Sequence, residues 1–232
     1  MKLKKLLSLL TAAGMCLVSV PLAPELLPEA VLTANAAEQG LLGPDHRWTL
    51  DDEGTLTITG TGPMRNFDIH YSSPFSWNEN IKRVVVSEGV TSIADNLFKN
   101  DGGEIQSNII SVTLPDTVTS IGAYAFYNCT NLAEINIPDS VTSIGAAAFF
   151  GCKSLTEIKI PEGVTSIADY TFFGCENLAS VTIPSSVTSF GEYAFRQCKS
   201  LASVTIPDNV TNIGDYAFSD CDNLASVTIP TV

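Results

Sequence analysis

Histidine is scarce in this chain, with two residues among 232. Neither His46 nor His70 is accompanied by a Ser-His-Asp order, by zinc-ligand spacing or by a phosphate-binding loop. The acidic run Asp51, Asp52 and Glu53 lacks the ligand spacing of a calcium loop, so it is interpreted as a turn. The sequence therefore predicts a protein without catalytic residues, metal or cofactor.

Basic residues are also few, with 12 Lys and Arg against 25 Asp and Glu and a formal net charge of −13. Removing residues 1–36, which hold three lysines and two glutamates, gives (12 − 3) − (25 − 2) = −14. An acidic surface repels phosphate backbones and anionic lipids. We therefore expect no nucleic-acid partner, and no segment after the N-terminal run is apolar enough for membrane insertion of the mature chain. The expected partner, a protein or glycan ligand on a host or bacterial surface, follows instead from the export signal and the repeat described below.

A long hydrophobic run occurs only at the N-terminus. Three lysines precede the apolar residues 6–20, and a small-x-small pattern ends at Ala36. These features predict a signal peptide over residues 1–36, cleavage before Ala37, and a secreted or cell-surface protein. The alternative is an uncleaved anchor, but the run is shorter than the roughly 20 residues of a spanning helix, and Pro21 interrupts it.

What the chain does contain is a repeat. Successive prolines differ by a constant interval, for example 138 − 115 = 23, and cysteine and phenylalanine follow the same interval. The positions are Pro115, Pro138, Pro161, Pro184, Pro207 and Pro230; Cys129, Cys152, Cys175, Cys198 and Cys221; and Phe126, Phe149, Phe172, Phe195 and Phe218. A period of this size is typical of solenoids, in which stacked units share hydrophobic layers.

One unit indicates how the chain turns in each repeat. Ile135 and Ile137 are two residues apart, so both point to one side of an extended strand, and Pro138 ends the pairing. Ala148 and Cys152 then share one face of a helical turn with Phe149. Each unit is therefore predicted to be a strand, a bend and a helical or 3-10 return.

A small residue begins each return. Because alanine is disfavoured at positive φ, its use beside glycine indicates that this position requires smallness rather than a left-handed backbone. The residues are Gly122, Gly145, Gly191 and Gly214, with Ala94 and Ala168 at the same position of other units.

The pattern L-x-x-I-x-I-P-x-x-V-x-x-I-x-x-x-A-F-x-x-C over residues 81–232 resembles the BspA-like class of bacterial leucine-rich repeats, the type found in TpLRR. The resemblance implies a right-handed α/β solenoid with a parallel β-sheet on one face and short helical or 3-10 turns on the other. It also implies a secreted or surface protein that adheres to host or matrix partners, and it implies no catalytic residues.

The chain divides into three predicted segments, namely a signal peptide at 1–36, an N-terminal cap at 37–80 and a repeat domain at 81–232. In the cap, residues 48–50 and 55–59 predict a β-hairpin that covers the apolar end of the stack.

Both ends of the repeat domain are irregular. In the first unit Ser87 replaces proline, and 115 − 98 = 17 residues separate phenylalanine from the next proline, against 138 − 126 = 12 in the second unit. This predicts an insertion of five residues. The sequence ends after a strand and its proline, so we expect either that the chain continues beyond Val232 or that a partner or a second copy covers this edge.

The five cysteines of the repeat admit several interpretations. Secretion favours disulfides, but five is an odd number, and metal sites require closely spaced pairs. Neighbouring rungs about 5 Å apart would permit a bridge, although parallel Cβ directions oppose it. Small buried thiols that fill one core position are the preferred interpretation.

Two sets of outward side chains are candidates for partner binding. On the strands, mostly serine and threonine alternate with the buried residues, and Glu134, Asn136, Glu157 and Lys159 depart from that pattern. On the returns, stacking would align aromatic residues into a stripe, and aromatics are enriched at protein interfaces. The alternative is that these rings only pack across neighbouring units. The stripe residues are Tyr124, Tyr127, Phe150, Tyr170, Phe173, Tyr193 and Tyr216.

The leading hypothesis is an exported, non-enzymatic repeat protein for protein–protein or cell-surface adhesion. The alternative is a carbohydrate- or cell-wall-binding accessory module of a larger secreted enzyme that continues beyond the C-terminus. A third possibility is a structural spacer without a ligand.

Overall fold

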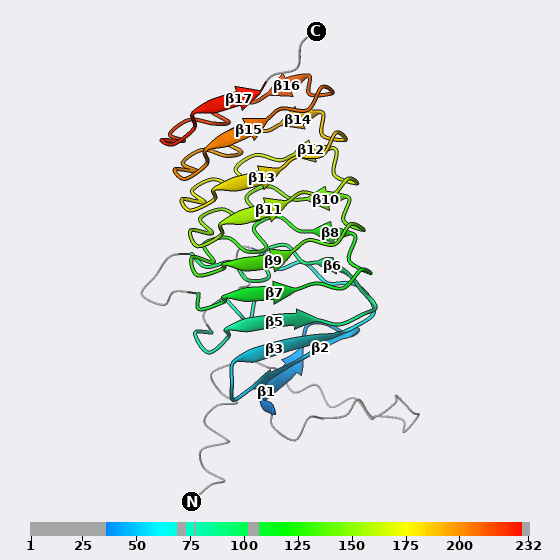
Figure 1. The fold of residues 1–232 in the computed structure, drawn as a ribbon. Coiled ribbons are helices and arrows are strands. Elements are labelled where there is room, and N and C mark those ends of the chain that lie inside the picture. Colours follow the sequence, from blue (N-terminus) through cyan, green and yellow to red (C-terminus); the bar gives the residue numbers. More distant parts are fainter. Residues whose placement is uncertain (1–35, 69–72, 77, 102–106, 229–232) are drawn as a thin grey trace, which may run out of the picture. The chain divides into compact units, whose positions relative to one another are not determined.

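The computed structural model describes residues 36–68, 73–76, 78–101 and 107–228. Beyond the N-terminal hairpin, its strands follow one another in two rows, and each turn of the coil, or rung, supplies one strand to each row (Figure 1). The first row contains β3 (Thr55–Gly60), β5 (Arg83–Val86), β7 (Ser111–Thr113), β9 (Glu134–Asn136), β11 (Glu157–Lys159), β13 (Ser180–Thr182), β15 (Ser203–Thr205) and β17 (Ser226–Thr228). The second row contains β4 (Gly62–Pro63), β6 (Val90–Ile93), β8 (Ser120–Ile121), β10 (Ser143–Ile144), β12 (Ser166–Ile167), β14 (Ser189–Phe190) and β16 (Asn212–Ile213).

The pairing register follows the repeat interval. Val112 pairs with Ile135 across β7 and β9, and Ile158 pairs with Val181 across β11 and β13, both in parallel. Since parallel pairing places equivalent residues side by side, a residue type that repeats in the sequence becomes a column in space. The predicted coil of stacked units with parallel strands is confirmed. The second row of short strands was not predicted.

An antiparallel hairpin begins the described chain. β1 (Ala36–Leu41) pairs with β2 (His46–Asp51), and β2 pairs with β3, which confirms the predicted hairpin. The Asp51 carboxylate accepts hydrogen bonds from the amides of Glu53 (3.0 Å) and Thr55 (2.8 Å), so the acidic run forms a turn. β3 then pairs in parallel with β5, and β4 with β6. The segment predicted as a cap thus also supplies the first strand of each row.

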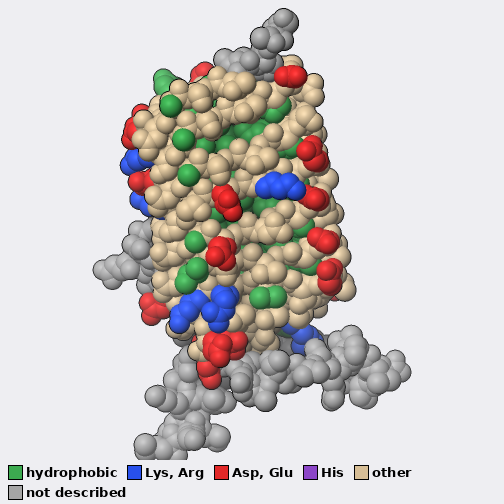
Figure 2. All heavy atoms as spheres, in the orientation of Figure 1, with side chains coloured by type: hydrophobic (Ala, Val, Ile, Leu, Met, Phe, Trp, Pro, Cys, Tyr) green, Lys and Arg blue, Asp and Glu red, His purple; other side chains and the backbone are tan. Residues whose placement is uncertain are grey.

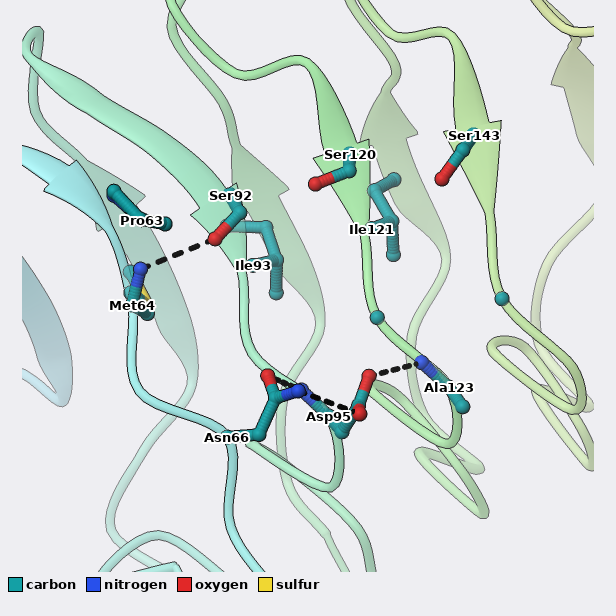
Figure 3. A pocket seen from close by; sticks show the side chains of 12 residues that line it. Pro63, Met64, Asn66, Ser92, Ile93, Asp95, Ser120, Ile121, Ala123 and Ser143 are labelled. Atoms are coloured by element: carbon teal, nitrogen blue, oxygen red, sulfur yellow. Dashed lines mark hydrogen bonds between the residues drawn. The ribbon is translucent and has the colours of Figure 1, made fainter.

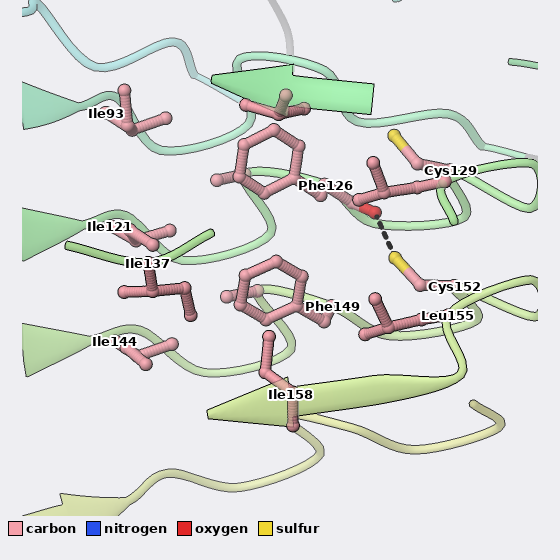
Figure 4. Close-up of a cluster of buried hydrophobic side chains, with 14 of the residues drawn as sticks. Ile93, Ile121, Phe126, Cys129, Ile137, Ile144, Phe149, Cys152, Leu155 and Ile158 are labelled. Atoms are coloured by element: carbon pink, nitrogen blue, oxygen red, sulfur yellow. Dashed lines mark hydrogen bonds between the residues drawn. The ribbon is translucent and has the colours of Figure 1, made fainter. Parts of the chain in front are cut away.

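A column of phenylalanines forms the centre of the core (Figure 4). The buried rings of Phe98, Phe126, Phe149, Phe172 and Phe195 stack in order, with centroids of neighbours 5.2 to 5.5 Å apart. Phe75 extends the column at its N-terminal end, and Trp48 packs edge-on against Phe75 with centroids 5.4 Å apart. The hairpin therefore covers the N-terminal end of the aromatic column.

The returns are not helical, so the predicted helical or 3-10 segments are wrong. No helix occurs in the described ranges, and accordingly none there is long and apolar enough to cross a membrane. Two positions of each return have positive φ, which ends any right-handed helical run. They are Tyr124, Ala147, Tyr170, Tyr193 and Tyr216, and then Asn128, Gly151, Gly174, Gln197 and Asp220.

The backbone hydrogen bonds explain this geometry. Alternate amides of a return donate to the next rung, as from Tyr124 N to Ala146 O (3.0 Å) and from Phe126 N to Ala148 O (2.8 Å). The amides between them close tight turns within the rung, as from Tyr127 N to Tyr124 O (3.2 Å). Pairing between rungs therefore satisfies the groups that a helix would pair internally.

Several predictions concern residues outside the described ranges. The predicted signal peptide lies outside them except for Ala36, and so do residues 102–106 of the predicted insertion. His70 is likewise outside them.

Candidate interaction surface

The predicted aromatic stripe forms on the returns, as two columns rather than one. The tyrosine column consists of Tyr124, Tyr170, Tyr193 and Tyr216, with Ala147 in the remaining rung. The outer column consists of Tyr127, Phe150 and Phe173. The two columns arise because the members of a rung, such as Tyr124 and Tyr127, are three residues apart.

The rings of the tyrosine column are exposed, except for the half-buried Tyr193, and all four tyrosines have a backbone of positive φ. Tyr170 stacks on Tyr193 with centroids 4.9 Å apart, and Tyr193 stacks on Tyr216 at 5.2 Å. Tyr170 is 37% exposed and Tyr124 39%. Each tyrosine has a φ between 56° and 58°, a conformation in which glycine and asparagine are favoured. Because rings stack face to face, the column presents ring edges and hydroxyl groups.

The outer column is packed more closely. The Phe150 centroid lies 4.6 Å from those of both Tyr127 and Phe173. All three side chains are half-buried. The outer column therefore combines packing between rungs with partial exposure to solvent.

Two cations flank the outer column, and the sequence analysis did not identify them. Lys99 Nζ lies 6.0 Å from the Tyr127 centroid, and the Arg196 guanidinium lies 5.8 Å from that of Phe173. Arg196 also lies 5.5 Å from the Tyr193 centroid, and its Nε donates to Asp220 Oδ2 at 2.9 Å. The signal was available, because 196 − 173 = 23 places Arg196 at the equivalent position of the next repeat.

The four polar residues predicted on the strands lie on two adjacent rungs. Glu134 and Asn136 belong to β9, Glu157 and Lys159 belong to β11, and all are exposed. Lys159 Nζ donates to Asp139 Oδ1 at 3.0 Å beside a hollow of about 340 Å³. Figure 2 shows charged side chains of both signs distributed over this face, among backbone and uncharged side chains. These residues and the aromatic columns occupy different segments of the rung.

A second hollow, of about 530 Å³, runs along the second strand row and is lined in part by Ser92, Ser120 and Ser143 (Figure 3). Two hydrogen bonds between successive rungs lie along this hollow. Asn66 Nδ2 donates to Asp95 Oδ2 (2.7 Å), and Asp95 Oδ1 accepts from the amide of Ala123 (2.7 Å). These carboxylate and amide groups therefore connect successive rungs.

Four of the five repeat cysteines have the predicted role of small, buried core thiols, and the fifth, Cys221, is half-buried. Cys152 Sγ donates to Phe126 O of the preceding rung at 3.3 Å (Figure 4). Cys175 Sγ likewise donates to Phe149 O at 3.2 Å. Desolvation raises the pKa of Cys175 to about 12, so the thiol stays protonated at neutral pH. A protonated thiol that donates to a carbonyl is a poor nucleophile and a poor metal ligand.

The other side chains considered for catalysis or metal binding make structural contacts. His46 is buried, and its Nε2 lies 3.2 Å from Gly62 O in the strand that follows the hairpin. Within the part of the chain that the structure describes, no three His, Cys, Asp or Glu side chains are placed to hold a metal ion.

Three solved structures with parallel repeats are similar to this chain. A leucine-rich cell surface protein from Faecalibacterium prausnitzii is 32% identical with a TM-score of 0.62, over 83% of this chain and 55% of that protein. A leucine-rich repeat protein from Bacteroides ovatus is 28% identical with a TM-score of 0.64, over 81% and 52%. The T. pallidum leucine-rich repeat protein is 30% identical with a TM-score of 0.59, over 78% of both chains.

The chain thus spans about half the length of the first two of these proteins. A search of curated proteins gave no match. The family model described as "BspA type Leucine rich repeat region" matches this chain in six copies, over residues 62–110 and 105–225. This match covers most of the stacked rungs, and it agrees with the parallel register and with the solved relatives. The chain belongs to the BspA-type leucine-rich repeat family.

Proposed function

We propose that this chain is an exported, non-enzymatic repeat protein that binds a protein partner on a host or bacterial surface. The observation that carries the proposal is the tyrosine column, in which the exposed Tyr170 and Tyr216 and the half-buried Tyr193 are aligned over consecutive rungs. An aligned array offers a partner several equivalent contacts, and tyrosine is enriched at protein interfaces. The similarity to a protein described as a cell surface protein supports the location.

A carbohydrate- or wall-binding module of a larger enzyme is the second candidate. In its favour, the chain spans 55% of the length of the Faecalibacterium relative, which leaves room for further domains. Against it, sugars stack on aromatic faces, and the faces of Tyr170 and Tyr193 are turned toward each other at 4.9 Å. The column geometry therefore favours a protein partner.

The test is direct binding of the purified protein to two coated surfaces, one carrying host extracellular-matrix proteins and the other carrying purified bacterial wall polysaccharide. We expect saturable binding to the matrix proteins only. Binding to the polysaccharide alone would support the accessory-module alternative. Binding to neither surface would contradict both candidates and leave the structural spacer.

A further inference from the structure

Three consecutive rungs carry an acidic residue followed directly by a tyrosine. The pairs are Asp169-Tyr170, Glu192-Tyr193 and Asp215-Tyr216. Their carboxylate side chains are exposed, although Asp169 Oδ1 also accepts from the amide of Glu192 in the next rung (2.8 Å). Their tyrosines are the stacked part of the tyrosine column. These six residues are named the acidic tyrosine strip.

The combination is specific to these rungs. The two preceding rungs have Ala123-Tyr124 and Ala146-Ala147 at the equivalent positions, so one lacks the acid and the other lacks both side chains. The backbone does not require this difference, because Ala147 adopts the same positive φ (53°) as the tyrosines. The backbone therefore does not require the tyrosines of the strip, whereas Asp169 also bonds to the next rung through the Glu192 amide.

The surface beside the strip already holds a guanidinium. Arg196 lies 5.5 Å from the Tyr193 centroid and donates to Asp220 Oδ2 at 2.9 Å, so it combines an aromatic contact with a carboxylate contact. The neighbouring rungs have Phe173 and Ser219 at that position, so neither supplies a second guanidinium. An exposed aromatic beside a carboxylate is an environment in which a cation is stabilised.

Electrostatics agree with this description. The pKa of the Tyr170 hydroxyl is raised by desolvation, then by Tyr193, Glu192 and Asp169, while Arg196 opposes the shift. The chain as a whole has a net charge of −13, which attracts cationic partners at long range.

The spacing of the strip distinguishes between partner conformations. Successive rings are 4.9 and 5.2 Å apart, so three rungs span about 10 Å. Positions i, i+4 and i+7 of an α-helix span about 10.5 Å on one face. Positions i, i+2 and i+4 of an extended strand span about 13 Å. The helix matches the strip over all three rungs.

We propose that the acidic tyrosine strip docks a basic helix of a partner protein, with Arg or Lys side chains at i, i+4 and i+7 placed between the tyrosine edges and the carboxylates of Asp169, Glu192 and Asp215. This proposal rests on the proposed function and specifies the class of partner.

The probe is a fluorescent alanine-based helical peptide with arginine at i, i+4 and i+7, titrated with the full chain and followed by anisotropy. The comparison peptide has the same three arginines distributed around the helix. We expect at least tenfold tighter binding of the aligned peptide, weakening as salt rises. Equal binding of the two peptides, or no binding, overturns the proposal.

The variant Asp169→Asn/Glu192→Gln/Asp215→Asn removes the charges and keeps the tyrosine stack. Its matched control, Asp116→Asn/Glu162→Gln/Asp208→Asn, removes three exposed carboxylates from the proline bends. We expect at least a tenfold loss for the first and less than a twofold loss for the second. Equal losses would assign the binding to net charge and overturn the strip. Adhesion to the matrix proteins could persist in that case, so failure here differs from failure of the proposed function.

Discussion

At the residue scale, stacking of the rungs limits the size of the side chain that fits at certain positions. Gly191 has no positive φ, yet a Cβ built on it would lie 2.5 Å from the backbone nitrogen of Asp169 in the preceding rung. The prediction that this position requires smallness is confirmed. Ala168 stands at the same position one unit earlier, so a single methyl group is accommodated in that rung.

We predict that Gly191→Ala destabilises the protein by about 2 kcal/mol or more, because the added methyl group must displace backbone of the preceding rung. The converse change, Ala168→Gly, should cost only about 1 kcal/mol through the greater flexibility of the unfolded chain. Urea denaturation of both variants checks the difference. A smaller loss in Gly191→Ala than in Ala168→Gly would contradict the clash.

The buried thiols predict a dependence of stability on pH. Desolvation raises the pKa values of Cys129 and Cys175 from 9.0 to about 12, so the folded protein keeps protons that the unfolded chain releases. The stabilisation is complete below pH 9.0 and is lost as pH rises toward 12, by up to about 1.4 kcal/mol per pH unit for each thiol. Urea midpoints measured between pH 7 and 11 report this slope.

Removing one thiol is the control for that prediction. Cys175→Ala should lower stability at neutral pH through lost packing, and it should also make the alkaline slope shallower by about one proton. An unchanged slope would show that other groups cause the alkaline loss.

At the element scale, the return was the part that sequence reasoning predicted incorrectly. Ala148, Phe149 and Cys152 do point into the core, as their spacing indicated. The same spacing is produced by a chain of tight turns, and periodicity alone does not distinguish the two. The decisive residues are Ala147 and Gly151, whose positive φ values of 53° and 68° follow from pairing with the next rung.

Two adjacent phenylalanines of one return test the division between core and surface. Phe172 is fully buried in the core column, whereas Phe173 is half-buried in the outer column. We predict a loss of about 3–5 kcal/mol for Phe172→Ala, because a large cavity forms. For Phe173→Ala we predict about 1 kcal/mol, the usual worth of a stacked aromatic pair at a surface. Denaturant midpoints measure both, and equal losses would assign the outer column to the core.

At the scale of the whole molecule, the repeat interval determined most of what could be predicted. Equal spacing of Pro138, Pro161 and Pro184 was sufficient to infer stacking and register, and the parallel register of β11 and β13 agrees. The proposed binding surface was less accessible from sequence, because Lys99 and Arg196 interrupt an aromatic pattern rather than repeat it. A residue type that repeats in the sequence predicts a column, but the distance between neighbouring rings of that column is known only from the structure.

The stacked architecture predicts that the array can be lengthened. Inserting a second copy of residues 162–184, one unit of 184 − 161 = 23 residues, after Pro184 should add one shared layer. We expect the free energy of unfolding to rise by about 1–3 kcal/mol, at ~0.05–0.15 kcal/mol per residue. Urea denaturation should also show a larger m-value. The same residues in scrambled order should lower stability, and a gain from the scrambled insert would contradict stacking.

The stacked rings of the tyrosine column also allow the register between rungs to be followed by spectroscopy. Phenol rings held 4.9 and 5.2 Å apart with nearly parallel planes form a chiral array of coupled chromophores. Such fixed aromatic packing gives near-ultraviolet circular dichroism, which vanishes when packing is lost even if strands persist. The C-terminal rungs thus contain an intrinsic spectroscopic reporter of their own alignment, readable without any attached label.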